Sequence, residues 1–186
     1  MSHPPLDAGL TAWRQFPRVM VTLFVYAFVS NIALALVPHE PVVVWYGPRL
    51  GVWLTGVIAT AGTIAASWAD HRLFAPLLSR AAGRPWWPAR LAGWVAETFG
   101  KAPFAILALS GITPLPFAPF KAAAFAAGYP LGPYLGAVAA GRFPRYLLLA
   151  WLGVAFSIPA PLLLGAFLFI LLPSFGAWLW HRTHEN

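Results

Sequence analysis

A single lysine, Lys121, lies within an apolar stretch, GITPLPFAPFKAAAFAAG, at residues 111–128. Three prolines, Pro114, Pro116 and Pro119, precede it in the same stretch. A charge at the centre of a bilayer costs about 2.5–3.5 kcal/mol on insertion scales, so Lys121 needs a partner or a water-filled cavity. An alternative is that its ammonium group extends to the interface beside the turn. We favour a functional role, in which Lys121 binds a phosphate group.

Two arginines, Arg142 and Arg145, are the second candidate for phosphate binding. They are three residues apart in the expected helix 132–156 and therefore share a face. Pro144 between them cannot donate to a carbonyl one turn earlier, which leaves an acceptor beside the guanidinium groups. A guanidinium group suits phosphate because its donors are planar and bidentate. The alternative is a kinked helix whose arginines pair with an acidic residue for packing alone.

Two acidic residues complete the set of candidate charges. Glu40 follows Pro38 by two residues, and Asp70 closes the second apolar stretch. A carboxylate in an apolar site holds a proton more readily than one in water. We therefore interpret Glu40 and Asp70 as proton carriers or counter-ions, although capping Arg72 or ending a helix is the simpler role for Asp70.

The sequence lacks the residue patterns of metal centres and of nucleophilic catalysis. It contains no cysteine, and His39 and His71 are single histidines without a second ligand at metal-binding spacing. A lipid phosphatase would need a nucleophile and a base, and no Ser-His-Asp or paired-histidine motif is present. We therefore expect no metal, no cofactor, no catalytic residue and no enzyme activity.

The elements that must position these charges are membrane helices. Hydrophobic residues make up 60% of the 186-residue chain and charged residues 9%, against about 25% charged in soluble domains. A membrane span needs about 20 apolar residues. Long apolar stretches cover residues 19–37, 50–69 and 146–180. We predict an all-α integral membrane protein with about four transmembrane helices.

The domain boundaries follow from these stretches. We expect one transmembrane domain at residues 18–180, after a cytoplasmic or interfacial segment at 1–17 and before a tail at 181–186. Residues 71–101 interleave arginine with tryptophan, which is typical of a segment in the membrane interface. Nucleic-acid binding uses similar residues, but in so apolar a chain we expect no nucleic-acid partner.

The basic residues predict the orientation of the chain. They gather before the first apolar stretch, after the second, and after the last. Positive residues mark cytoplasmic loops, so we expect both termini in the cytoplasm of a bacterial inner-membrane protein. If residues 102–128 formed a full span, helices at 132–156 and 159–180 would leave Arg182 outside. A re-entrant dip at 102–128 returns Arg182 to the cytoplasm, and its prolines allow the chain to break and reverse.

An internal repeat supports a second dip. An 81-residue shift places Glu40 on Lys121 and Gly47 on Gly128, although chance can produce such matches in an apolar chain. If real, the repeat is inverted, with two opposed re-entrant hairpins of the kind found in transporters. The residues expected at the hairpin turns are Pro38, Gly47, Pro114, Pro116, Pro119 and Gly128.

The sequence resembles the DedA family of membrane proteins, also called the VTT domain, and in particular the short YqaA-like branch of that family. The resemblance covers about residues 30–155. It is carried by a proline-rich turn, a lysine, Ala-Ala-Gly, and Gly-Arg with a second arginine and an aromatic residue, and by an acidic motif near the first turn. In this chain these residues are Lys121, Gly128, Gly141, Arg142, Arg145 and Tyr146, with Pro38, Glu40 and Gly47 for the acidic motif.

The resemblance implies two facing re-entrant hairpins and the movement of lipids such as undecaprenyl phosphate or phosphatidylethanolamine. This chain departs from the better-studied branch, where two arginines flank a proline in the second hairpin. Here Lys121 takes one of these positions and Thr113 lies near the other.

From these observations we expect a flippase or scramblase for a phosphorylated lipid, with Lys121, Arg142 and Arg145 binding the phosphate. Protons are an expected coupling ion, and a homo-oligomer is compatible with the sequence. The alternatives are a proton-coupled transporter of a small solute and a structural protein of the membrane.

Overall fold

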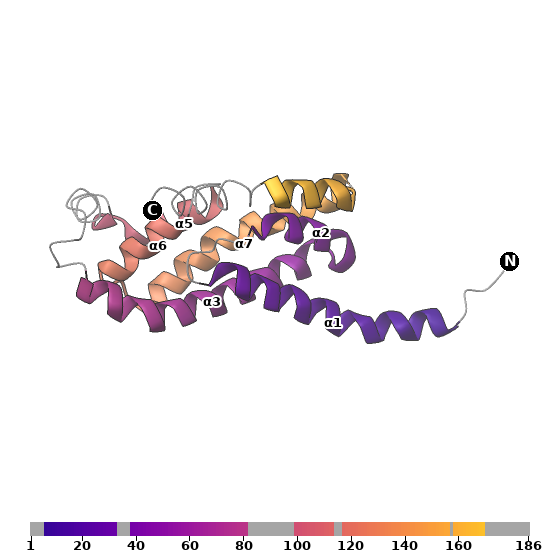
Figure 1. The fold of residues 1–186 in the computed structure, drawn as a ribbon, viewed down its shortest axis with the longest axis horizontal. Helices are drawn as coiled ribbons and strands as arrows, with labels where there is room; N and C mark the ends of the chain where they lie inside the picture. Colours follow the sequence, from indigo (N-terminus) through magenta and orange to yellow (C-terminus); the bar gives the residue numbers. More distant parts are fainter. Residues whose placement is uncertain (1–5, 33–37, 82–98, 114–116, 157, 170–186) are drawn as a thin grey trace, which may run out of the picture.

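A computed structural model describes residues 6–32, 38–81, 99–113, 117–156 and 158–169 of the chain. Every regular element in this part is a helix, which confirms the predicted all-α class. The order along the chain is α1 (Leu6–Asn31), α2 (Glu40–Leu50), α3 (Val52–Ala81), α5 (Pro103–Ile112), α6 (Phe117–Ala126) and α7 (Leu131–Phe156). A last short helix, Ala160–Phe169, follows α7 (Figure 1).

Two long helices form the centre of the molecule. Helix α3 has 30 residues and α7 has 26, and they pack against each other. They are antiparallel, because Gly56 near the start of α3 approaches Leu147, whereas His71 further along lies against Tyr134 near the start of α7. At about 1.5 Å per residue both helices exceed the roughly 30 Å of a hydrocarbon core.

The remaining labelled helices pack on these two in a repeated pattern. In the first half, α1 packs on α3 of its own half, and α2 packs on α7 of the other half. In the second half, α5 packs on α7 of its own half, and α6 packs on α3 of the other half. The two halves of the chain therefore have the same order of helices and the same packing partners.

The turns of the two halves lie at glycines with positive φ. Gly51 between α2 and α3 has a φ of 79°, and Gly128 between α6 and α7 has a φ of 65°. Glycine adopts this conformation without steric cost. The prediction that Gly128 lies at a turn is confirmed. The prediction that Gly47 lies at a turn is wrong, because Gly47 lies inside α2. The 81-residue shift pairs Gly51 with Gly132, so the structural repeat runs in a slightly different register from the one read in the sequence.

The four prolines expected at hairpin turns differ in where the structure places them. Pro38 precedes α2, and Pro119 lies in the first turn of α6 rather than at a reversal. A proline is tolerated there because the first N–H groups of a helix have no intrahelical acceptor. Pro114 and Pro116 lie outside the described residues, between α5 and α6.

The predicted helix boundaries need three adjustments. Helix α1 begins at Leu6, inside the segment expected to precede the first span, and ends at Asn31. Helix α3 continues beyond the expected end near residue 69 and reaches Ala81. The expected dip at 102–128 consists of α5 and α6, each of ten residues or about 15 Å, half of a hydrocarbon core.

One helical segment in the described part of the chain, Val52–Leu78, is both long and apolar enough to cross a membrane. This segment permits membrane association. Of the expected interfacial segment at 71–101, the first part belongs to α3, and residues 82–98 with their tryptophans lie outside the described residues.

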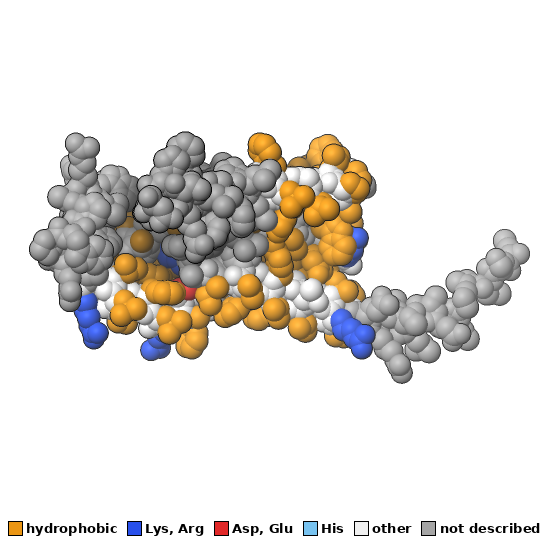
Figure 2. All heavy atoms as spheres, in the orientation of Figure 1, with side chains coloured by type: hydrophobic (Ala, Val, Ile, Leu, Met, Phe, Trp, Pro, Cys, Tyr) orange, Lys and Arg blue, Asp and Glu red, His pale blue; other side chains and the backbone are white. Residues whose placement is uncertain are grey.

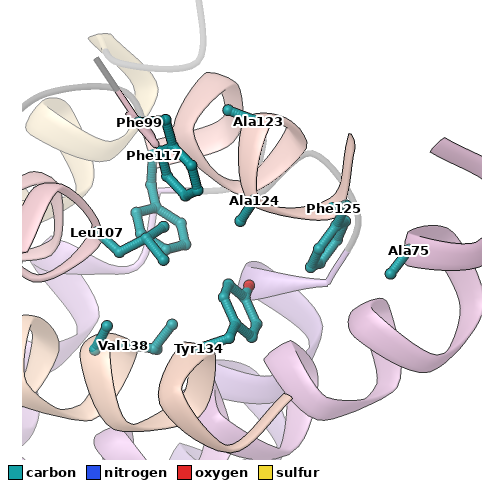
Figure 3. Close-up of a cluster of buried hydrophobic side chains, with 10 residues drawn as sticks. Ala75, Phe99, Leu107, Phe117, Ala123, Ala124, Phe125, Tyr134 and Val138 are labelled. Carbon is teal, nitrogen blue, oxygen red and sulfur yellow. The ribbon is translucent and has the colours of Figure 1, made fainter. Parts of the chain in front are cut away.

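The largest apolar cluster lies between α5, α6 and α7. Figure 3 shows Leu107, Phe117, Phe125 and Tyr134 converging from these helices. All four are buried, and the rings of Phe125 and Tyr134 are 5.3 Å apart. This cluster fixes the two short helices of the second half against α7.

Helix α2 approaches α7 so closely that two glycines are required. A Cβ atom on Gly153 would lie 2.0 Å from the carbonyl oxygen of Val44, and one on Gly47 would lie 2.2 Å from that of Ala150. Real Cβ atoms do not approach backbone oxygens to these distances, so a larger residue would push the two helices apart.

We predict that Gly153→Ala destabilises the protein by about 1–3 kcal/mol, the usual cost of overpacking, because α2 must shift away from α7. Thermal unfolding of the purified protein in detergent, followed by tryptophan fluorescence, measures this loss. Gly132→Ala is the matched control on the same helix, since a Cβ there meets nothing within 4 Å. Equal stability of the two variants would contradict the close packing of α2 on α7.

Candidate functional site

Lys121 lies in an ion pair in the interior. Its ammonium group donates a hydrogen bond to Asp70 on α3, and the two side chains are 6% and 0% exposed. It also donates to the backbone carbonyl of Asn31, the last residue of α1, over 3.2 Å. Lys121 therefore joins α6 to α3 and to the end of α1. Asp70 lies inside α3, which continues to Ala81, so the prediction that Asp70 ends a helix is wrong.

Glu40 and Arg145 form a second ion pair across the two halves. An Arg145 nitrogen donates to Glu40 Oε1 over 2.8 Å, and another donates to the carbonyl of Thr113, which caps the end of α5. Glu40 is the first residue of α2, where the helix dipole favours a negative charge. Arg145 therefore holds the start of α2 and the end of α5 together on α7. Glu40 and Lys121, which the repeat made equivalent, each pair with the long helix of the other half.

Arg142 differs from the other two candidate cations. Its side chain is buried, and its guanidinium carbon lies 4.9 Å from the centre of the Phe117 ring. Within the described part of the chain it forms no ion pair, and its Nε has no hydrogen-bond partner. The charge of Arg142 acts on Glu40, but Glu40 already accepts a hydrogen bond from Arg145. A buried cation without a carboxylate of its own is costly, so Arg142 is suited to receive an anion.

His39 lies beside Glu40 in this group of charged residues, although the sequence predicted no metal-binding role for it. Its buried ring meets Tyr146 edge-on with centroids 5.2 Å apart, and its Nδ1 lies 3.9 Å from Glu40 Oε2. Tyr146 in turn shares a hydrogen bond of 2.9 Å with Thr63 on α3. The position of His39 directly before Glu40 was the one signal in the sequence that placed it at this site.

His71 lies apart from these residues, near the turn at Gly128. Its Nε2 is 2.9 Å from the carbonyl oxygen of Tyr129, and its ring packs against Phe125 and Tyr134. With Arg72 and Gly128 it lines a cavity of about 500 Å³. His71 therefore stabilises the turn between α6 and α7 and takes no part in the charge cluster.

A mostly apolar groove of about 310 Å³ lies between α3 and α6, next to the Lys121–Asp70 pair. Leu77 and Leu78 line it from α3, and Ala118, Ala122 and Phe125 line it from α6, together with Lys121 itself. It is open at the surface rather than enclosed. The groove therefore brings an apolar channel up to a buried charge.

The chemistry of this arrangement is ionic. Three cations and two carboxylates meet in the interior, which leaves one positive charge, that of Arg142, unpaired among the described residues. No group of three histidine, cysteine or acidic residues that could hold a metal ion occurs in this part of the chain. The arrangement can bind an anion between α2, α6 and α7. No family model, no curated protein and no solved structure matches the chain.

We predict that Lys121→Met and Asp70→Asn each destabilise the protein by roughly 3–5 kcal/mol, because either change leaves one buried charge without its partner. The double variant should recover much of that loss, since neither charge remains. A double-mutant cycle of unfolding free energies measures the coupling between the two residues. Arg80→Met, at an exposed position of α3, is the control and should have little effect. Additive losses in the double variant would show that the pair does not hold α6 to α3.

Proposed function

We propose that this protein moves a phosphate-bearing lipid across the membrane, as the resemblance to the DedA family implies. The observation that supports it best is Arg142, a buried guanidinium group without a counter-ion in the described part of the chain. Guanidinium groups bind phosphate through paired donors, and a phosphate at this position would supply the missing negative charge. Lys121 and Arg145, already paired with carboxylates, would adjust their pairing as the phosphate passes.

The distribution of side chains supports a place in the membrane. Large apolar residues such as Val21, Trp53, Leu77 and Trp151 are at least half exposed, whereas Asp70, Lys121 and Arg142 are buried. Figure 2 shows apolar side chains over the described part of one face, with basic side chains toward its ends. Apolar residues on the outside and charges on the inside suit a lipid environment better than water.

The packing of the helices supports opposed hairpins. In this proposal α3 and α7 cross the membrane, α1 and α2 enter from one side, and α5 and α6 enter from the other. Arg145 contacts both the start of α2 and the end of α5, so the breaks of the two hairpins would meet near the middle of the membrane. Broken helices that meet there are the common plan of transporters with inverted repeats.

This arrangement changes the expected orientation of the N-terminus. If α1 forms one arm of a hairpin, the start of α1 and the Gly51 turn lie at the same end of the molecule. Val19 does pack in one cluster with Leu50 and Leu54, next to that turn. The N-terminus would then lie opposite the basic segment at 71–101, and not on its side as the charge pattern alone predicted.

Single-cysteine labelling tests this arrangement, because the chain has no cysteine of its own. We expect an impermeant maleimide to reach Arg18→Cys and Arg49→Cys from one side of the membrane, and Lys101→Cys and Gly132→Cys from the other. Labelling before and after permeabilisation of spheroplasts measures the sidedness. Labelling of Arg18→Cys and Arg49→Cys from opposite sides would show instead that α1 crosses completely.

The open groove between α3 and α6 favours a lipid over a small solute. A small-solute transporter would enclose an aqueous cavity, whereas this groove is mostly apolar and open to the surroundings. A hydrocarbon chain could remain in contact with the membrane along it while the headgroup is inside. The proton-coupled solute transporter and the structural protein remain the alternatives that an assay must separate.

We predict that proteoliposomes containing the protein expose trace fluorescent phospholipid of the inner leaflet to an impermeant quencher, and that Arg142→Gln slows this movement at least about tenfold. Loss of a hydrogen bond to a charged group costs about 1.5–3 kcal/mol, and each 1.4 kcal/mol is a factor of ten. Lys121→Ala and Arg145→Ala should also slow it. Arg80→Gln, with an exposed side chain, should move lipid at the rate of the wild type.

The outcome that contradicts the proposal is equally specific. Wild-type protein that moves neither fluorescent phospholipid nor undecaprenyl phosphate would exclude the lipid function and favour the solute transporter. Full lipid movement by Arg142→Gln would separate the function from the buried charge cluster.

A further inference from the structure

Two buried nitrogen atoms of the charge cluster lack hydrogen-bond partners in the described part of the chain. They are His39 Nε2 and Arg142 Nε, and both residues are only 5% exposed. Buried polar atoms nearly always have a partner, and leaving one without costs about 1–3 kcal/mol. Two such atoms in one small region indicate that a ligand completes the hydrogen bonding there.

His39 and Arg142 both lie near Tyr146. His39 meets Tyr146 edge-on, and Arg142 stands one turn before Tyr146 on the same face of α7. The charge of Arg142 acts on both Tyr146 and His39. Both unpartnered nitrogens therefore belong to residues near Tyr146, one on α7 and one directly before α2.

The carboxylates of the interior are less suited than His39 to exchange a proton. Glu40 accepts a hydrogen bond from Arg145, and Asp70 accepts one from Lys121. A carboxylate held by a cation is stabilised in its charged form. Among the described residues His39 has no such hydrogen-bonded partner. The groups that act on it there are Glu40, 3.9 Å from Nδ1, and the guanidinium groups of Arg142 and Arg145.

We propose that His39 and Arg142 together bind the phosphate oxygen, and that His39 takes up one proton from solvent when the anion binds. This inference rests on the proposed function. Without an anion, burial and two nearby guanidinium groups disfavour a positive charge on the ring and outweigh the attraction of Glu40. A neutral ring with its proton on Nδ1, toward Glu40, leaves Nε2 as an acceptor.

When the anion binds, His39 Nε2 changes from an acceptor to a donor, and the net charge of the buried region does not change. The anion brings one negative charge, and His39 Nε2 gains one proton, so the buried region changes its net charge by zero. Nε2–H of His39 and Nε–H of Arg142 then both donate to the anionic oxygen. The neighbouring Glu40–Arg145 pair is less deeply buried, with side chains 29% and 15% exposed.

Calorimetric titration of the full chain in detergent tests the proposal, with dihexanoyl phosphatidylglycerol and dimethyl phosphate as probes. Both are phosphodiesters whose single charge does not titrate near neutral pH. Comparison of two buffers with different ionisation enthalpies gives the protons taken up. We expect the wild type to take up about one proton per lipid near pH 7.

Variants show which residue takes up this proton. His39→Gln should bind at least about tenfold more weakly and take up no proton, and His39→Phe, which keeps a ring against Tyr146, should behave likewise. Arg142→Gln should not bind. His71→Gln is the matched control, because His71 Nε2 already lies at hydrogen-bond distance from Tyr129, and it should keep the uptake.

The results separate this inference from the proposed function. Lipid binding without proton uptake in the wild type, or uptake that persists in both His39 variants, would overturn the role of His39 and leave lipid movement standing. Binding of neither probe would overturn both. Dimethyl phosphate binding as tightly as the lipid would support the anion site and assign it to a free phosphate ester.

Discussion

A charge buried away from water needs a partner, and the packing of the helices depends on that constraint. Lys121 and Arg145 each pair with a carboxylate of the molecule, whereas Arg142 forms no ion pair in the described part of the chain. Lys121, Arg142 and Arg145 are surrounded by apolar helices, and the two carboxylates near them come from the opposite half of the chain. An ion pair of this kind is no more stabilising than a well-packed apolar pair, so stability alone does not explain its presence. Each pair joins a short helix of one half to the long helix of the other half.

The same cations also satisfy the backbone where the helices break. The last carbonyl groups of a helix have no intrahelical donor, and in an apolar interior each unmade bond costs several kcal/mol. Lys121 donates to the carbonyl of Asn31, Arg145 to that of Thr113, and Tyr26 to that of Pro38 over 2.9 Å. Polar side chains therefore donate to backbone carbonyls at the end of α1, at the end of α5 and just before α2.

Much of this could be predicted from the sequence. The apolar composition gave the helical class, and a lone lysine among prolines located a broken segment at 102–128. The repeat placed Gly47 at a turn, but Gly47 lies inside α2 and permits close packing on α7. In sequence alone, a glycine needed for close packing cannot be told from a glycine needed for a turn. The partners of the charges could not be predicted, since Asp70 and Lys121 meet only through the packing of α6 on α3, which no local spacing encodes.

The two ion pairs differ in a way that bears on movement. The Lys121–Asp70 pair is almost fully buried, whereas Glu40 and Arg145 keep part of their side chains at the surface. Separating the enclosed pair would leave two charges without any solvent, so it costs more than separating the pair that is less deeply buried. The two halves therefore share a plan of packing, but their ion pairs differ in how deeply they are buried.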